Sequence, residues 1–158
     1  MQQESRLRRS MFGSNDQYAQ TPDHVLDQLK SMFNRGKPMW DPCPVNPQHD
    51  ALTLEDWQSD CCYLNPPYGN IQPFLEKAIV ETKKGRTIVA LIPCRCNTNW
   101  YHDKVLNETH VHEIHHVRQG VKFKNYKKKS PFAVCVVVYR PTPRRRLEVK
   151  SLDFYTKK

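Results

Sequence analysis

The sequence lacks the features that mark a membrane protein, a secreted protein or a zinc protein. No apolar stretch approaches the length of a membrane span, and the first ten residues, MQQESRLRRS, contain no signal-peptide core. None of the six cysteines forms a C-x-x-C pair, and four lie in or beside apolar runs. These absences favour a cytoplasmic protein (or one of the nucleus or a virus-infected host cell) with reduced cysteines, no membrane contact and no metal site.

Basic residues outnumber acidic ones and are unevenly placed. Lys and Arg total 25 against 16 Asp and Glu, which gives a formal net charge of +9. They cluster at residues 6–9, 122–129 and 144–146 and at the C-terminus. Charge that serves solubility alone needs no clustering. The pattern therefore favours a polyanionic partner, whose neutralised phosphates release counterions.

Four histidines fall in the segment HVHEIHH, residues 110–116. A metal site needs convergent ligands, whereas alternation along a strand would divide these side chains between two faces. We therefore expect a strand facing solvent or a nucleic acid.

The length of 158 residues fits one domain with its own core, and no internal repeat is present. Residues 1–17 are polar and aperiodic and predict a mobile basic arm. Residues 18–141 predict the folded domain, and residues 142–158 a basic C-terminal extension.

Helical and strand patterns alternate along the folded domain. A first helix is expected from Pro22, with Thr21 as its cap, to a stop at Gly36; a second runs from Pro73 to Gly85, and a shorter one covers residues 97–106. Strands are expected within residues 38–44, 61–65, 86–93, 111–117, 121–123 and 131–141. The order predicts an α/β three-layer sandwich with a mostly parallel sheet. The last two strands are joined too briefly for a crossover helix, so one antiparallel C-terminal strand is expected.

Three short polar signals follow predicted strands. They are Asp41-Pro42-Cys43-Pro44, Asn65-Pro66-Pro67-Tyr68, and Pro93 with Arg95. Ligands of α/β sheets bind at the carboxyl ends of the strands, so we expect these signals to form one site.

The turn Asn65-Pro66-Pro67-Tyr68 is stiff because each proline fixes φ and lacks an N–H group. The Pro66 carbonyl and the Asn65 side-chain oxygen are two neighbouring acceptors, which suit an amine with two N–H groups. Tyr68 offers a flat face for a planar ring. The turn thus predicts a holder for an aminated heterocycle; the plain alternative is a rigid connection between a strand and a helix.

The NPPY tetrapeptide resembles motif IV of S-adenosylmethionine-dependent amino-methyltransferases. The span from Thr21 to Tyr139 resembles the compact phage-type DNA N6-adenine methyltransferases. The resemblance rests on an ordered series of strings: TPDHVLDQL, WDPCP, DAL, W, LNPPYGNIQPFLEKA, GRTIVALIPCRCNTNWYHDKV, GVKF and SPFAVCVVVY. It implies a Rossmann-like methyltransferase domain at residues 18–141, S-adenosyl-L-methionine as cofactor, double-stranded DNA as partner, and methylation of adenine N6.

The resemblance also implies roles for individual residues. The target amine would be held by Asn65 and Pro66 of the catalytic turn, which includes Pro67, while Tyr68 would stack on a flipped base. Phe123 would pack against that base, and Lys122, Lys124 and Arg95 would contact DNA. The implied cofactor-binding residues are Thr21, Pro22, Asp41, Pro42, Cys43, Asp50, Leu52 and Asn65.

The chain departs from the family pattern before the NPPY turn. The usual G-x-G turn is replaced by residues 41–46, and Asn65 follows Asp41 by only 24 positions. No ribose-binding acid stands out; Glu55, Asp56 and Asp60 are the candidates. Two other functions stay open: an RNA or protein amino-methyltransferase, and an inactive nucleic-acid-binding module that kept the base-holding turn.

Overall fold

The computed structural model describes residues 19–45, 47 and 49–156; the predicted N-terminal arm, 1–17, lies outside them. The described α-helices are α2 (Asp23–Phe33), α3 (Gln72–Lys83) and α4 (Asn99–Tyr101). A short 3₁₀-helix, η1 (Tyr68–Asn70), precedes α3, and a short π-helix, η2 (His102–Leu106), continues α4. The described strands are β1 (Cys61–Leu64), β2 (Thr87–Pro93), β3 (Val111–Val117), β4 (Val134–Tyr139) and β5 (Glu148–Leu152).

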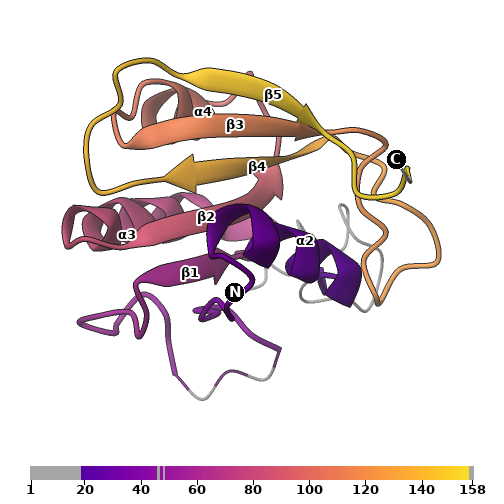
Figure 1. Cartoon of the computed structure of the whole chain (residues 1–158), viewed down its shortest axis with the longest axis horizontal. Helices are drawn as coiled ribbons and strands as arrows, with labels where there is room; N and C mark the ends of the chain where they lie inside the picture. Colours follow the sequence, from indigo (N-terminus) through magenta and orange to yellow (C-terminus); the bar gives the residue numbers. More distant parts are fainter. Residues whose placement is uncertain (1–18, 46, 48, 157–158) are drawn as a thin grey trace.

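The five strands form one sheet in the order β1-β2-β4-β3-β5 (Figure 1). β1 pairs parallel with β2, and β3 pairs parallel with β5. β4 is antiparallel to both of its neighbours, β2 and β3. Four of the five strands therefore run in the same direction, and only β4 runs the other way. This confirms the expected α/β class with a mostly parallel sheet, whereas the Rossmann-like detail stays a prediction.

The position of the antiparallel strand differs from the expectation. β4 lies in the interior of the sheet and is not the last strand, because the chain returns after it and adds β5 beside β3. β5 falls within residues 142–158, which the sequence indicated as a basic extension, and Phe154 just after it is buried. The sequence signal was weak because β5 is an edge strand whose side chains are mostly exposed.

Helices cover both faces of the sheet (Figure 1). On one face Val25 and Leu29 of α2 join a core cluster with Val134, Val136 and Val138 of β4. On the other face α3 and the α4–η2 segment pack against the intervening residues of β4. A strand buried on both faces reads as a continuous apolar run, which explains the sequence of residues 134–139.

Two of the predicted strands are reduced or absent. Residues 38–44 contribute a single parallel bridge from Trp40 to Cys62, because prolines on both sides cannot donate to a ladder. Residues 121–123 form no strand: the Val121 carbonyl accepts from the Ser130 N–H, and the Lys122 N–H donates to the Tyr155 hydroxyl at 2.8 Å. Their backbone groups are bonded to neighbouring loops and not to a sheet edge.

The helix ends agree with the sequence at one terminus of α2 and differ at the other. Gly36 takes a positive φ of 77° and donates its N–H to the Lys30 carbonyl at 2.9 Å, which closes the helix. At the start, Pro22 is the N-cap and no side chain caps the helix. Thr21 does not cap α2; its hydroxyl bonds to Tyr63 and Asn65 instead.

Candidate functional site

Two of the three polar sequences that follow predicted strands lie close together in the structure. Asn65 follows β1, and Asp41 follows the bridge that runs alongside it. Both side chains line a cavity of about 130 Å³. The residues around this cavity are Ala19, Gln20, Thr21, Leu26, Asp41, Cys43, Val45, Tyr63, Asn65 and Lys124. Arg95, the third signal, lines neither this cavity nor the next one.

A second cavity of about 230 Å³ adjoins the first, since Cys43 lines both. Its walls come from the loop after Trp40, from the turn after β1 and from α3. The lining residues are Pro42, Cys43, Pro44, Pro47, His49, Asp50, Ala51, Pro67 and Phe74. We call the two cavities together the cleft: Asp50 lines the wider one, Asn65 lines the narrower one, and Cys43 lines both. The volumes add to the lower end of the range typical of small-molecule sites.

Most of the expected cofactor-binding residues lie along this cleft. Thr21, Asp41 and Asn65 are at the narrower end, Cys43 is between the cavities, and Pro42 and Asp50 are at the wider end. Leu52 and Pro22 line neither cavity. The Leu52 N–H instead bonds to Asp50 Oδ1 at 2.9 Å, which fixes the Asp50 side chain.

A buried hydrogen-bond network sets the orientation of the Asn65 amide. Asn65 Nδ2 donates to the Ala19 carbonyl at 2.6 Å and to Thr21 Oγ1 at 3.3 Å. Thr21 Oγ1 in turn lies 2.5 Å from the Tyr63 hydroxyl. Because both partners of the nitrogen are acceptors or hydroxyls from the segment before α2, the amide oxygen must point the other way.

The Asn65 oxygen accepts a hydrogen bond from the Tyr68 hydroxyl at 2.7 Å, and this hydroxyl also lies 3.2 Å from the Leu91 carbonyl. The Tyr68 ring is only 4% exposed and packs edge-on against Phe123 and Phe132. Burial holds the pKa of Tyr68 well above its usual value, so the phenol is a neutral donor. The ring expected to offer an open stacking face is therefore covered in this structure, and Phe123 is fully buried beside it.

Asp41 is a partly buried carboxyl in the cleft. Burial raises the pKa of Asp41 to about 6, although the Cys43 N–H bonds to its Oδ1 at 2.8 Å and His49 lies nearby. Within the described part of the chain, Asp41 forms no ion pair. A buried carboxylate of this kind is stabilised by a cationic ligand group.

Cys43 is a neutral thiol between the two cavities. Burial, followed by the charges of Asp41 and Asp50, raises the pKa of the Cys43 thiol to about 12. The thiolate is the nucleophilic form of cysteine, so covalent catalysis by Cys43 is disfavoured.

Sequence reasoning missed Tyr63 and His49. Tyr63 lies in β1 and lines the narrow cavity, and His49 lines the wide one, where its ring stacks on Trp40 at a centroid distance of 5.3 Å. The sequence signal for His49 was its position beside Asp50; Tyr63 had none beyond its place in a strand. The ribose candidates Glu55, Asp56 and Asp60 line neither cavity.

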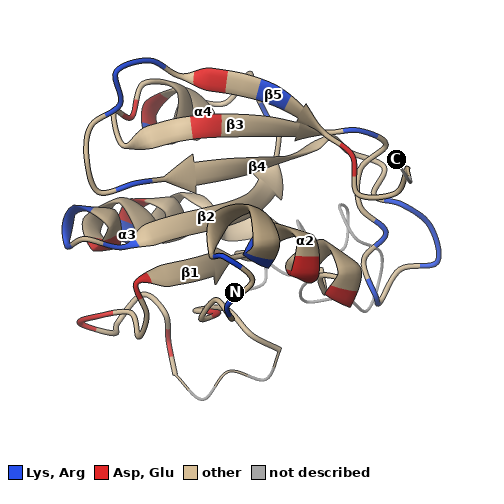
Figure 2. Ribbon diagram, viewed as in Figure 1, with Lys and Arg blue, Asp and Glu red and all other residues tan. Residues whose placement is uncertain are grey.

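Basic residues gather at two opposite ends of the sheet (Figure 2). The loop of residues 122–129 lies at the end where β3 finishes, and Lys124 of this loop lines the narrow cavity and forms an ion pair with Asp23 at 2.8 Å. Lys122 is exposed on the same loop. The loop of residues 140–147 lies at the opposite end (Figure 2). Its Arg144 is used structurally, since it donates to the carbonyls of Leu106, Glu108 and Val111.

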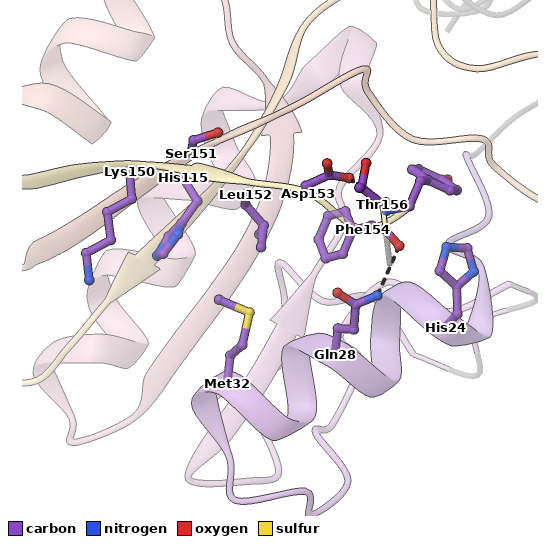
Figure 3. A pocket seen from close by; sticks show the side chains of 11 residues that line it. His24, Gln28, Met32, His115, Lys150, Ser151, Leu152, Asp153, Phe154 and Thr156 are labelled. Carbon is purple, nitrogen blue, oxygen red and sulfur yellow. Dashed lines mark hydrogen bonds between the residues drawn. The ribbon is translucent and has the colours of Figure 1, made fainter. Parts of the chain in front are cut away.

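A wider depression lies between α2 and residues 150–156 (Figure 3). Its volume is about 1050 Å³, but none of the expected site residues lines it. Its charged groups are engaged within the protein: Lys150 pairs with Glu113 and Glu148, and Asp153 accepts from the backbone of residues 155 and 156. The dashed bond in Figure 3 likewise joins Gln28 to the Phe154 carbonyl. Size alone therefore does not identify this depression as the site.

Two features are absent from the described residues. No helix there has the length and apolar character required to span a membrane. In the same residues, no group of three or more His, Cys, Asp or Glu side chains is arranged to hold a metal ion.

Comparison with known proteins agrees with the geometry. The family model described as DNA N-6-adenine-methyltransferase (Dam) matches residues 12–155. A segment of 68 residues is 34% identical to the "DNA N-6-adenine-methyltransferase" of Haemophilus phage HP1 (strain HP1c1). This segment covers 42% of the chain but only 39% of the length of the phage protein. No solved structure matches. Because the family model spans most of the sequence, the chain belongs to the DNA N-6-adenine-methyltransferase (Dam) family.

Proposed function

We propose that this protein transfers a methyl group from S-adenosyl-L-methionine to the N6 amine of adenine in double-stranded DNA. The observation that carries the proposal is the cleft that runs from Asp50 to Asn65 and ends at the oriented amide of the NPPY turn. Family membership supports the same reaction.

The residues of the cleft fit the cofactor. Asp41 offers a buried carboxylate where a cationic group would restore the electrostatic balance, and Thr21 and Asn65 lie in the same cavity. The wide cavity has apolar and proline walls with Asp50 at its rim, a combination suited to an aminated ring. When bound, the cofactor supplies an electrophilic methyl group on a sulfonium.

The methyl acceptor would be held by the NPPY turn. Asn65 is aimed by its bonds to Ala19 and Thr21, so its oxygen can accept from a substrate amine once the Tyr68 hydroxyl has moved away. The Pro66 carbonyl is the second acceptor. Two acceptors on the amine hydrogens draw the nitrogen toward tetrahedral geometry and free its lone pair, so positioning replaces a charged general base.

The target adenine must leave the duplex to reach this turn, at a cost of a few kcal/mol of lost stacking. Tyr68 and Phe123 then supply aromatic surface for the flipped base, with displacement of the Tyr68 ring from its present packing. Lys122 and Lys124, at the same end of the sheet as the turn, would grip the flanking phosphates. Arg95, which follows β2, would also contact the DNA.

The deciding experiment is transfer of a labelled methyl group to DNA and to RNA, followed by mass spectrometry of the nucleosides. N6-methyladenine formed from duplex DNA supports the proposal. If RNA or a protein amide is methylated and DNA is not, the substrate is RNA or protein and the proposed DNA substrate is wrong. Calorimetry with S-adenosyl-L-methionine addresses the inactive-module alternative: absence of binding at high micromolar cofactor would overturn the proposed enzyme.

A further inference from the structure

Glu81 in the last turn of α3 is a carboxylate with no solvent exposure. Its Oε1 accepts the backbone N–H of Trp57, which lies 24 positions earlier in the chain. Its Oε2 lies 3.1 Å from Lys84 Nζ and 3.9 Å from Arg86 Nη1. Burying a carboxylate costs several kcal/mol unless it is paired, so a role in holding Trp57 would explain its presence inside the fold.

Trp57 connects this carboxylate to the wide cavity. Its indole is 1% exposed and donates Nε1–H to the Ala51 carbonyl at 3.0 Å. Ala51 and its neighbour Asp50 line the cavity. On its other side the Trp57 ring contacts Trp40, and Trp40 stacks on His49, a third lining residue. The indole therefore supports the cavity wall from behind.

Two lysines, one within α3 and one at its C-cap, also bind residues 55 and 56, just before Trp57. Lys84 Nζ donates to the Glu55 carbonyl at 2.5 Å and pairs with Asp56 at 3.1 Å, and Lys77 Nζ reaches the Glu55 carbonyl at 3.3 Å. The start of α3 lines the cavity directly through Phe74. One helix thus contributes Phe74 to the cavity lining near its start and, near its end, binds the segment that follows Asp50 and Ala51.

We propose that Glu81 is a positioning residue for cofactor binding, which acts through Trp57 to hold residues 50–57 against the cofactor. This inference rests on the proposed function. It predicts that loss of the Glu81 carboxylate weakens cofactor binding while DNA binding and the rest of the fold are retained.

The test compares four variants with wild type by calorimetry with S-adenosyl-L-methionine. Glu81→Leu removes the acceptor, Glu81→Gln keeps an acceptor at the same position along the side chain, and Trp57→Phe keeps an aromatic ring, smaller than the indole, but loses the N–H donor. Val80→Ala is the control, because Val80 is 48% exposed on the same helix. We expect Glu81→Leu and Trp57→Phe to raise the dissociation constant about tenfold or more, equivalent to about 1.4 kcal/mol. Glu81→Gln is expected to stay within about threefold of wild type, and Val80→Ala within about twofold.

A second readout separates positioning from general damage. Affinity for duplex DNA without cofactor is expected to change less than about twofold in all four variants. The indole N–H signal of Trp57, observed by NMR with nitrogen-labelled tryptophan, is expected to shift in Glu81→Leu and not in Val80→Ala. If Glu81→Leu does not fold, Trp57→Phe still tests the proposal, because Glu81 is proposed to act through Trp57 and unchanged cofactor affinity in Trp57→Phe would overturn it.

Two outcomes are distinguishable. Folded Glu81→Leu or Trp57→Phe protein that binds cofactor as wild type does would overturn the inference and leave the proposed function intact. Wild-type protein that binds no cofactor would overturn the proposed function itself, and the positioning role would fall with it.

Discussion

The Tyr68 hydroxyl and the Asn65 side-chain oxygen are joined by a 2.7 Å hydrogen bond within the NPPY turn. The Asn65 oxygen, which we propose as the acceptor for the substrate amine, is therefore already hydrogen-bonded within the protein. Both residues are buried, and an unpaired buried acceptor costs about 1–3 kcal/mol. Tyr68 thus stabilises the turn in this structure, and under the proposed function the target base would have to exchange with the Tyr68 hydroxyl.

The first prediction concerns Asn65→Ala. The substitution removes the oxygen that would hold the target amine, so methyl transfer is expected to fall below detection in the labelled-methyl assay. The dissociation constant for cofactor should stay within about threefold, since other polar side chains of the narrow cavity remain. Turnover equal to that of wild type would show that Asn65 does not hold the amine.

The second prediction compares Tyr68→Phe with Tyr68→Ala. Phenylalanine keeps a ring for stacking but leaves the Asn65 oxygen without the Tyr68 donor. The free energy of unfolding should therefore decrease by about 1–3 kcal/mol. Its kcat/KM for DNA should stay within about threefold of wild type because the base no longer has to displace a hydroxyl. Alanine also loses the stacking surface, worth about 1–3 kcal/mol, and should lower kcat/KM by about 10- to 100-fold. Denaturant titrations and steady-state kinetics measure the two effects, and equal kinetics for both variants would contradict the stacking role.

The third prediction uses the raised pKa of Asp41. Only the ionised carboxylate attracts a cationic ligand group, so cofactor affinity should rise with pH through the value of about 6 and level off above pH 7. At pH 5 the dissociation constant should be about tenfold larger than on the plateau. Calorimetry between pH 5 and pH 8 checks this, and Asp41→Asn should abolish the dependence while binding weakly throughout.

The fourth prediction concerns stability and the same carboxyl. In the folded protein the pKa of Asp41 is raised from 3.8 to about 6, so between these values the native state binds more protons than the unfolded state. The Asp41 contribution to the free energy of unfolding should therefore decrease as pH rises from about 4 to about 6, by about 3 kcal/mol in total. The difference between wild type and Asp41→Asn in urea titrations isolates it. A difference that does not vary with pH would show that Asp41 is not perturbed.

The fifth prediction locates the phosphate contacts. Lys122→Ala and Lys124→Ala should each weaken DNA binding and reduce the slope of log affinity against log salt by about one. Arg145→Ala is the matched control, because Arg145 is exposed at the opposite end of the sheet. Binding isotherms at several salt concentrations measure the slopes. An equal reduction in Arg145→Ala would place the DNA across a different surface.

Much of the site was predictable because its signals are local. Prolines at 66 and 67 dictate a stiff turn wherever they fold, and the apolar runs at 86–93 and 131–141 indicated buried strands that the structure contains as β2 and β4. The clustering of lysines at 122–129 was likewise visible in the sequence. The span between Asp41 and Asn65 is too short for two further strands with helices between them, and its described residues contain one strand, β1, and no helix.

Other features depend on contacts between residues far apart in the chain, which no local pattern specifies. β5 has mostly exposed side chains and is recognised only by its pairing with β3. The buried state of Tyr68 follows from Phe123 and Phe132, more than 50 positions away, and the partner of Glu81 is a backbone N–H in a distant loop.

The sequence by itself therefore determined the alternation of helices and strands, the rigid NPPY turn and the basic loop, because proline geometry, apolar periodicity and charge act over a few residues. The tertiary structure alone decided that Asp50, Cys43 and Asn65 line neighbouring cavities, that the Tyr68 hydroxyl bonds to the Asn65 oxygen, and that Glu81 accepts the Trp57 N–H. These features depend on hydrogen bonds between buried groups that are far apart in the chain. Such partners come together only when the core packs, so no local sequence pattern specifies them.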